Sequence, residues 1–140
     1  MGKINGAETT AKAETNPRGK MIAYWSVTLL LAVAVMLSGI GQLMQLGGNI
    51  ELVTNLGYPL YILTILGIWK VLGAIALVIP GFPRLKEWVH AGIFFLMTGA
   101  ALSHALANDY GEYGFYMILP LSYAGLNIAS WALRPMSRKL

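Results

Sequence analysis

The stretch that decides the fold runs from Met21 to Ile50 and reads MIAYWSVTLLLAVAVMLSGIGQLMQLGGNI. It contains no Asp, Glu, Lys or Arg, and it is longer than the ~20 mostly apolar residues that a helix needs to cross a bilayer. The strands of a membrane β-barrel are about 9–11 residues long and alternate in polarity, whereas this stretch is continuously apolar. It therefore predicts a transmembrane helix.

Three further long stretches of low charge follow the first. Leu52 to Pro83 contains one charged residue, Lys70, while Trp88 to Asn108 and Tyr113 to Leu133 contain no Asp, Glu, Lys or Arg. Turn signals, such as the Pro80-Gly81-Phe82-Pro83 connection, separate them. The predicted spans lie near 22–46, 58–80, 86–107 and 114–133.

These spans predict an all-α fold, a four-helix transmembrane bundle. We divide the chain into a flexible cytoplasmic tail (1–20), a membrane domain (21–135) and a short basic cytoplasmic tail (136–140). The segment 49–57 is too short to span a bilayer and is expected to be a loop or a short interfacial helix. Gly47 and Gly48 are expected to end the first helix.

The composition agrees with a membrane protein. Of 140 residues, 56% are apolar and 11% are charged, whereas a soluble domain carries about 25% charged residues. The chain has no cysteine, which excludes disulfides, thiolate metal sites and thiol redox chemistry within it. Two histidines about 21 Å apart along one helix, with no acid inside a span, do not predict a metal site either.

The basic residues indicate an orientation. All ten Lys and Arg residues except Lys70 precede the first span, lie between the second and third, or follow the fourth. With four spans these regions share one side of the membrane, and the positive-inside rule places them, and both termini, in the cytoplasm. Because the positive charge follows the topology, we expect a lipid bilayer as partner and no nucleic acid.

Lys70 is the most informative single residue. It lies about 16 Å from either end of its span, too deep for its side chain to reach water along a lipid-facing surface. Three polar side chains are expected near its depth: Ser38, Thr98 and Tyr123. Lys70 is then a polar core residue that fixes the packing of the helices, or a group that binds an anionic ligand or carries a proton.

A second polar group is expected toward the outer end of the bundle. His104 is predicted at a depth similar to that of Gln42, and Tyr61 lies near that level. These residues could line a polar pocket that opens outward with Lys70 as its floor, which would suit a quinone head group. The alternative is a hydrogen-bonded interfacial histidine without a ligand.

Small residues suggest where the third and fourth helices meet. Gly99 and Ser103 are four residues apart, as are Gly125 and Ala129. Small residues at this spacing let neighbouring helices approach closely in a membrane. We therefore expect close contacts at both pairs.

Several short strings follow one another across roughly residues 20–135. The strings are Ser38-Gly39, Leu56-Gly57-Tyr58-Pro59, Ile65-Leu66-Gly67-Ile68-Trp69-Lys70-Val71-Leu72-Gly73, Pro83-Arg84-Leu85-Lys86-Glu87-Trp88, Ala91-Gly92, Gly99-Ala100 and Ser103-His104. In their order and spacing, these strings together resemble the DoxX-like family of small bacterial membrane proteins.

The resemblance implies a four-helix bundle in the bacterial cytoplasmic membrane. The namesake of the family is the membrane subunit of a thiosulfate:quinone oxidoreductase, and other relatives associate with thiol or oxidative-stress enzymes. For this chain, the resemblance implies an accessory or quinone-interacting subunit of a redox complex. A soluble redox enzyme is then the implied partner, and quinone is the only candidate cofactor. Lys70 and His104 carry over as family motif positions without an established role.

Two other functions remain open at this point. One is a small proton-coupled carrier that works as a homo-oligomer, because Lys70 is an ionisable residue near the membrane midplane. The other is a structural or assembly factor that binds no ligand.

Overall fold

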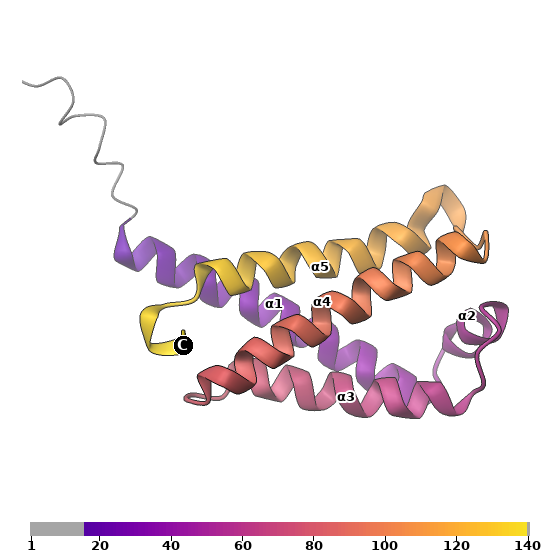
Figure 1. The fold of residues 1–140 in the computed structure, drawn as a ribbon, viewed down its shortest axis with the longest axis horizontal. Helices are drawn as coiled ribbons and strands as arrows, with labels where there is room; N and C mark the ends of the chain where they lie inside the picture. The colour runs from indigo at the N-terminus through magenta and orange to yellow at the C-terminus, as the bar shows by residue number, and fades with distance from the viewer. Residues whose placement is uncertain (1–15, 140) are drawn as a thin grey trace, which may run out of the picture.

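Over residues 16–139, the part that the computed structural model describes, the chain forms helices joined by short turns and loops, and no strand (Figure 1). The all-α prediction is confirmed for these residues, and α2 forms in the segment expected to be a loop or a short helix. The α-helices are α1 (Pro17–Leu43), α2 (Asn49–Asn55), α3 (Tyr61–Val78), α4 (Pro83–Leu106) and α5 (Phe115–Leu133). Two short 3₁₀ helices, η1 (Glu112–Gly114) and η2 (Met136–Arg138), flank α5.

The first helix starts and ends earlier than its predicted span. It begins at Pro17, where the side chain of Asn16 accepts a hydrogen bond from the backbone N–H of Arg18, so its first turn belongs to the segment expected to be a tail. It ends at Leu43 because Gln45, not Gly47, is the first residue after it with a left-handed backbone (φ 52°). The predicted tail before Asn16 lies outside the described residues.

The four long helices pack as two pairs, and α1, a member of the first pair, also contacts the second. α3 packs along α1, and α4 packs along α5, while α1 also contacts α5. Figure 1 shows α3 and α4 close together at the end where residues 79–82 join them and diverging toward the other end. The helices α3 and α4 have few contacts with each other, and this divergence creates the cavities described below.

Two glycines set the distance between α1 and α3. A Cβ atom on Gly67 would lie 2.8 Å from the carbonyl oxygen of Gly39 and 2.6 Å from Leu43. A Cβ atom on Gly39 would lie 2.9 Å from the Cβ of Lys70. Only glycine therefore allows the two backbones to approach this closely.

The predicted glycine contacts between the third and fourth helices, α4 and α5, are wrong. A Cβ atom on Gly99 or on Gly125 would meet nothing within 4 Å. Gly99 lines a cavity instead, and Gly125 is exposed on α5. The helices α4 and α5 are joined at other positions, through polar side chains.

Buried hydrogen bonds attach α5 to its neighbours. Asn127 and His90 form a reciprocal pair: Asn127 Nδ2 donates to the His90 carbonyl at 2.8 Å, and its Oδ1 lies 2.8 Å from His90 Nδ1. Ser130 and Thr28 join their hydroxyl groups at 2.6 Å. Each of these polar side chains is buried and finds a partner, as burial requires.

The helices α1, α3 and α4 are long and apolar enough to cross a membrane. The chain is thus an all-α protein with membrane-type helices. α5 falls outside this group, although its 19 residues include many large apolar side chains. Asn127, Ser130 and Pro120 lower its average hydropathy.

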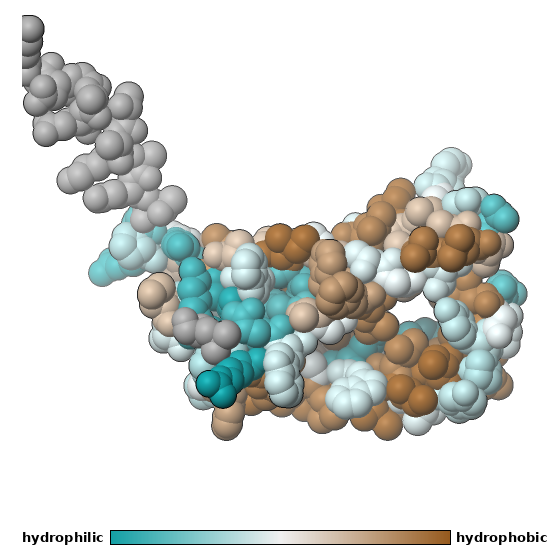
Figure 2. All heavy atoms as spheres, in the orientation of Figure 1, coloured by the Kyte–Doolittle hydropathy of each residue, from teal (hydrophilic) through white to brown (hydrophobic). Residues whose placement is uncertain are grey.

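The surface of the bundle divides into two regions. Figure 2 shows hydrophobic residues along the helices and hydrophilic residues gathered at the end where α1 begins and the chain finishes. Many large apolar side chains are exposed, among them Leu30, Val33, Trp69 and Phe95. In water such an apolar surface would promote aggregation, whereas it is suited to contact with lipid.

Candidate functional site

Two cavities lie between α3 and α4 where these helices diverge. Leu66 on α3 and Leu96 on α4 line both of them and separate one from the other. We name them the Lys70 cleft and the His104 cavity after the ionisable residue in each.

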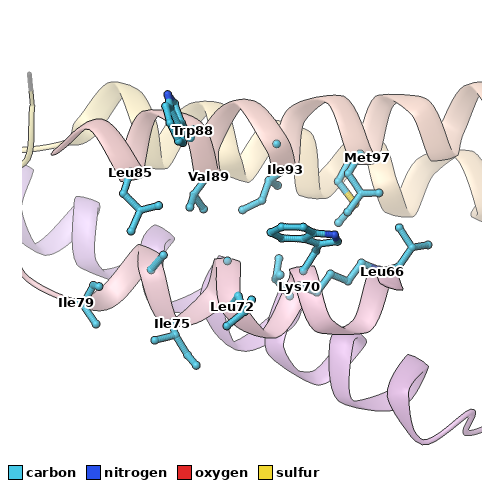
Figure 3. A pocket seen from close by; sticks show the side chains of 16 residues that line it. Leu66, Lys70, Leu72, Ile75, Ile79, Leu85, Trp88, Val89, Ile93 and Met97 are labelled. Carbon is cyan, nitrogen blue, oxygen red and sulfur yellow. The ribbon is translucent and has the colours of Figure 1, made fainter. Parts of the chain in front are cut away.

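The Lys70 cleft has a volume of about 600 Å³ and almost entirely apolar walls. In Figure 3 the side chains of Leu85, Val89, Ile93 and Met97 extend from α4 toward α3, where Lys70 lies. Lys70 is the only charged residue among those that line the cleft. The lining residues are Val35, Leu66, Trp69, Lys70, Leu72, Gly73, Ile75, Ala76, Ile79, Leu85, Trp88, Val89, Gly92, Ile93, Leu96 and Met97.

The ammonium group of Lys70 is held at the junction of α1 and α3. Lys70 is buried, and its Nζ donates a hydrogen bond to Ser38 Oγ at 2.9 Å. The contact is possible because Gly39 and Gly67 bring the two helices together beside it. No acidic side chain forms an ion pair with Lys70 among residues 16–139.

The other two side chains expected near Lys70 do not bond it. Thr98 Oγ1 donates to the carbonyl oxygen of Phe94 on its own helix at 2.8 Å. Tyr123 is half-buried and packs against the apolar core around Leu31 and Met97. Of the three, Ser38 alone is a hydrogen-bond partner of Lys70.

The His104 cavity is smaller, about 380 Å³, and more polar. Its apolar walls come from α2, α3 and α4, and five polar side chains enter it. These are Gln42, Asn49, Tyr58, Ser103 and His104. The cavity combines apolar walls with a few convergent polar groups, which is typical of small-molecule sites.

Two contacts fix the imidazole ring of His104. Its Nδ1 lies 3.3 Å from Asp109 Oδ2, and the ring is tilted against that of Tyr116 with centroids 5.3 Å apart. An ionised carboxylate only accepts hydrogen bonds, so Nδ1 carries the hydrogen. In the neutral ring Nε2 is then an acceptor, and in the protonated ring it is a donor.

Gln42 brings an unsatisfied amide to the same cavity. Its Oε1 is buried and has no hydrogen-bond partner among the described residues. Beside it, the hydroxyl groups of Tyr58 and Ser103 lie 3.1 Å apart and connect the segment before α3 to α4. A buried polar atom without a partner costs free energy, which a ligand that bonds it would recover.

The structure separates two groups that the sequence placed in one pocket. Lys70 does not line the His104 cavity, and the floor of that cavity is apolar at Leu66 and Leu96. Tyr61 is not among the residues that line it, and this residue is 65% exposed. Gln42 and His104 do share the cavity, as expected from their similar depth.

Sequence reasoning missed several residues of this region. Asp109 lies five residues after His104, beyond the end of α4 and next to the left-handed Asn108 (φ 54°), so no helical spacing predicts this contact. Tyr58 and Ser103 are far apart in the chain, as are His90 and Asn127, so no local pattern identifies either pair. Among the described residues, no group of three or more acidic or histidine side chains could hold a metal ion.

The comparisons with known proteins give the family and nothing closer. No curated protein and no solved structure matches the chain. The family model described as the DoxX-like family matches residues 26–130, which include most of α1, all of α2 to α4, most of α5 and both cavities. The match covers well over half of the sequence, and the chain is therefore a member of the DoxX-like family of membrane proteins.

Proposed function

We propose that this protein is a membrane-embedded subunit of a redox complex that binds the head group of a quinone in the His104 cavity. The observation that supports it most is the convergence of five polar side chains within a cavity whose other walls are apolar. The cavity volume of about 380 Å³ is in the range of small-molecule sites. The isoprenoid tail would leave past Phe95, which lines the cavity and is exposed.

The chemistry of the polar groups suits both oxidation states of such a ligand. A quinone carbonyl accepts hydrogen bonds, whereas a quinol hydroxyl also donates them. The amide of Gln42, the hydroxyls of Tyr58 and Ser103, and the imidazole of His104 can each donate or accept. The site can therefore offer hydrogen-bond partners to the head group before and after reduction.

The electrons would come from a partner enzyme. The chain has no cysteine, so thiol–disulfide chemistry within it is excluded, and a soluble redox enzyme is the proposed donor. The protein would then supply the membrane anchor and the quinone site, while the partner would oxidise the donor substrate.

Replacing His104 with phenylalanine tests the site. Phenylalanine keeps an aromatic ring next to Tyr116 but removes both ring nitrogens, so we expect binding of a short-tail benzoquinone to weaken at least about tenfold, or ~1.4 kcal/mol. Binding is measured by titration of the purified protein in neutral detergent. Tyr110→Phe is the matched control, because Tyr110 is exposed outside the cavity and its hydroxyl bonds the Ala105 carbonyl. Equal affinity in the wild type and H104F would exclude His104 from the site.

We also propose that α5 is a fourth span and that both termini face the cytoplasm of a bacterium. α5 is long enough for ~28 Å, close to the ~30 Å of the hydrocarbon core. Its polar residues Asn127 and Ser130 are buried against α4 and α1, while its exposed large side chains are apolar or aromatic. Those side chains are Phe115, Ile118, Leu119, Leu121, Ile128 and Trp131.

Reporter fusions test this topology. A reporter that is active only in the cytoplasm should be active after residue 140 and inactive after residue 50, because an odd number of spans separates the two positions. A reporter active only outside should give the opposite result. The same activity at both positions would contradict the four-span topology.

A further inference from the structure

The ammonium group of Lys70 has unused hydrogen-bonding capacity. A lysine ammonium has three N–H donors, and Ser38 Oγ accepts one of them. No other hydrogen bond and no ion pair of this group occurs among the described residues. A buried ammonium group is costly unless it is paired and hydrogen-bonded, so the site favours an anion that accepts the remaining donors.

The space next to Lys70 is shaped for an apolar chain. The Lys70 cleft has a volume of about 600 Å³ and runs between α3 and α4 with walls of leucine, isoleucine, valine, methionine and tryptophan. Trp69 and Trp88 line it and are 66% and 76% exposed, so the cleft is open toward the surroundings of the bundle. Lys70 is the only charged residue that lines this groove. A single cation beside an apolar groove is complementary to one anionic end on a long apolar chain.

We propose that the Lys70 cleft binds a long-chain aliphatic carboxylate. The carboxylate accepts charge-assisted hydrogen bonds from Lys70 Nζ, which are stronger than bonds between neutral groups. The alkyl chain lies between α3 and α4 against Ile93 and Met97. Such a ligand pairs the ammonium group and fills the apolar space, whereas a neutral ligand of the same length would leave the charge unpaired.

This site is separate from the proposed quinone site. Leu66 and Leu96 lie between the two cavities, and Lys70 lines only one of them. Binding of a carboxylate can therefore be measured independently of quinone binding, and a failure of one proposal leaves the other intact.

Tryptophan quenching tests the proposal, because Trp69 and Trp88 line the cleft. Dibrominated stearate is titrated into the protein in neutral detergent, and its neutral counterpart, dibrominated stearyl alcohol, is titrated in parallel. For the wild type, the carboxylate concentration that gives a certain degree of quenching should be at least about tenfold lower than the alcohol concentration that gives the same quenching. In Lys70→Met, which keeps most of the side-chain volume, the two curves should coincide.

Arg84→Met is the matched control, since it removes one positive charge from an exposed residue that does not line the cleft. It should keep the wild-type preference for the carboxylate. If the carboxylate and the alcohol quench the wild type equally, the proposal is overturned. It is also overturned if K70M still prefers the carboxylate to the alcohol. Equally strong, Lys70-dependent quenching by brominated phosphatidylglycerol would overturn it in favour of a two-chain lipid.

Discussion

Replacing Gly67 with alanine should lower the free energy of unfolding by about 1–3 kcal/mol, the usual cost of an overpacked contact. The new Cβ would lie 2.8 Å from the carbonyl oxygen of Gly39 and 2.6 Å from Leu43. Because one of these atoms belongs to the α1 backbone, a side-chain rotation cannot remove the overlap, and α1 and α3 must separate. Denaturation in mixed detergent micelles measures the change.

Gly99→Ala is the control for this prediction. Gly99 also lies within a long helix, but a Cβ atom there would meet nothing within 4 Å. Alanine is favoured over glycine in a helix by up to about 1 kcal/mol, so G99A should be as stable as the wild type or more stable. If G67A and G99A unfold alike, the close approach of α1 and α3 does not exist.

Replacing Lys86 with methionine should lower the free energy of unfolding by roughly 3 kcal/mol, because it removes two hydrogen bonds from a charged donor. Lys86 is 1% exposed, and its Nζ donates to the carbonyl oxygens of Ala76 and Ile79. These carbonyls belong to the last turn of α3 and its cap, where no further helical N–H can reach them. Methionine fills a similar volume but leaves the Ala76 carbonyl without this partner, while the Ile79 carbonyl keeps only the longer bond, 3.3 Å, from Arg138 Nη1.

Arg84→Met provides the comparison for Lys86. Arg84 is in the same turn of α4 but is exposed, so its replacement should change the free energy of unfolding by no more than about 0.5 kcal/mol. Both variants are measured by denaturation in the same micelles. Equal effects of K86M and R84M would show that the hydrogen bonds of Lys86 do not stabilise the end of α3, whose carbonyls also accept from Arg138.

The helices could be predicted from the sequence because long uncharged stretches leave few alternatives. α5 ends at Leu133, where the predicted span ends, whereas α4 begins at Pro83, before the predicted start near 86 and within the predicted Pro80–Pro83 connection. The unusual backbone of Gln45 could not be predicted, because an ordinary residue with positive φ leaves no mark in the sequence. It ends α1 before the two glycines that were expected to do so.

The faces of the helices were harder to predict than their existence. Gly67 and Gly99 look alike in the sequence, yet one contacts a neighbouring backbone and the other lines a cavity. Depth in the membrane follows from position along a helix, whereas direction changes by about 100° with each residue. The positions of Lys70 and His104 along the bundle therefore predict one pocket, whereas in the structure the two residues line different cavities.

Lys86 shows that the direction of a charged side chain is equally hard to predict from the sequence. In the sequence it belongs to a short basic connection between two spans and looks like an exposed residue. Because α4 begins at Pro83, Lys86 is already on the helix and turned toward the end of α3. Its burial depends on how these two helices pack, which no local pattern contains.

The divergence of α3 and α4 determines how a ligand would be supplied to the Lys70 cleft. Trp69, Trp88 and Leu72 line this opening and are exposed on the apolar surface of the bundle. A hydrophobic molecule would therefore arrive sideways from the bilayer, where it is dissolved, and not from the aqueous phase. Its occupancy would depend on its mole fraction in the lipid, so dilution with additional vesicles would release it even at a constant total concentration.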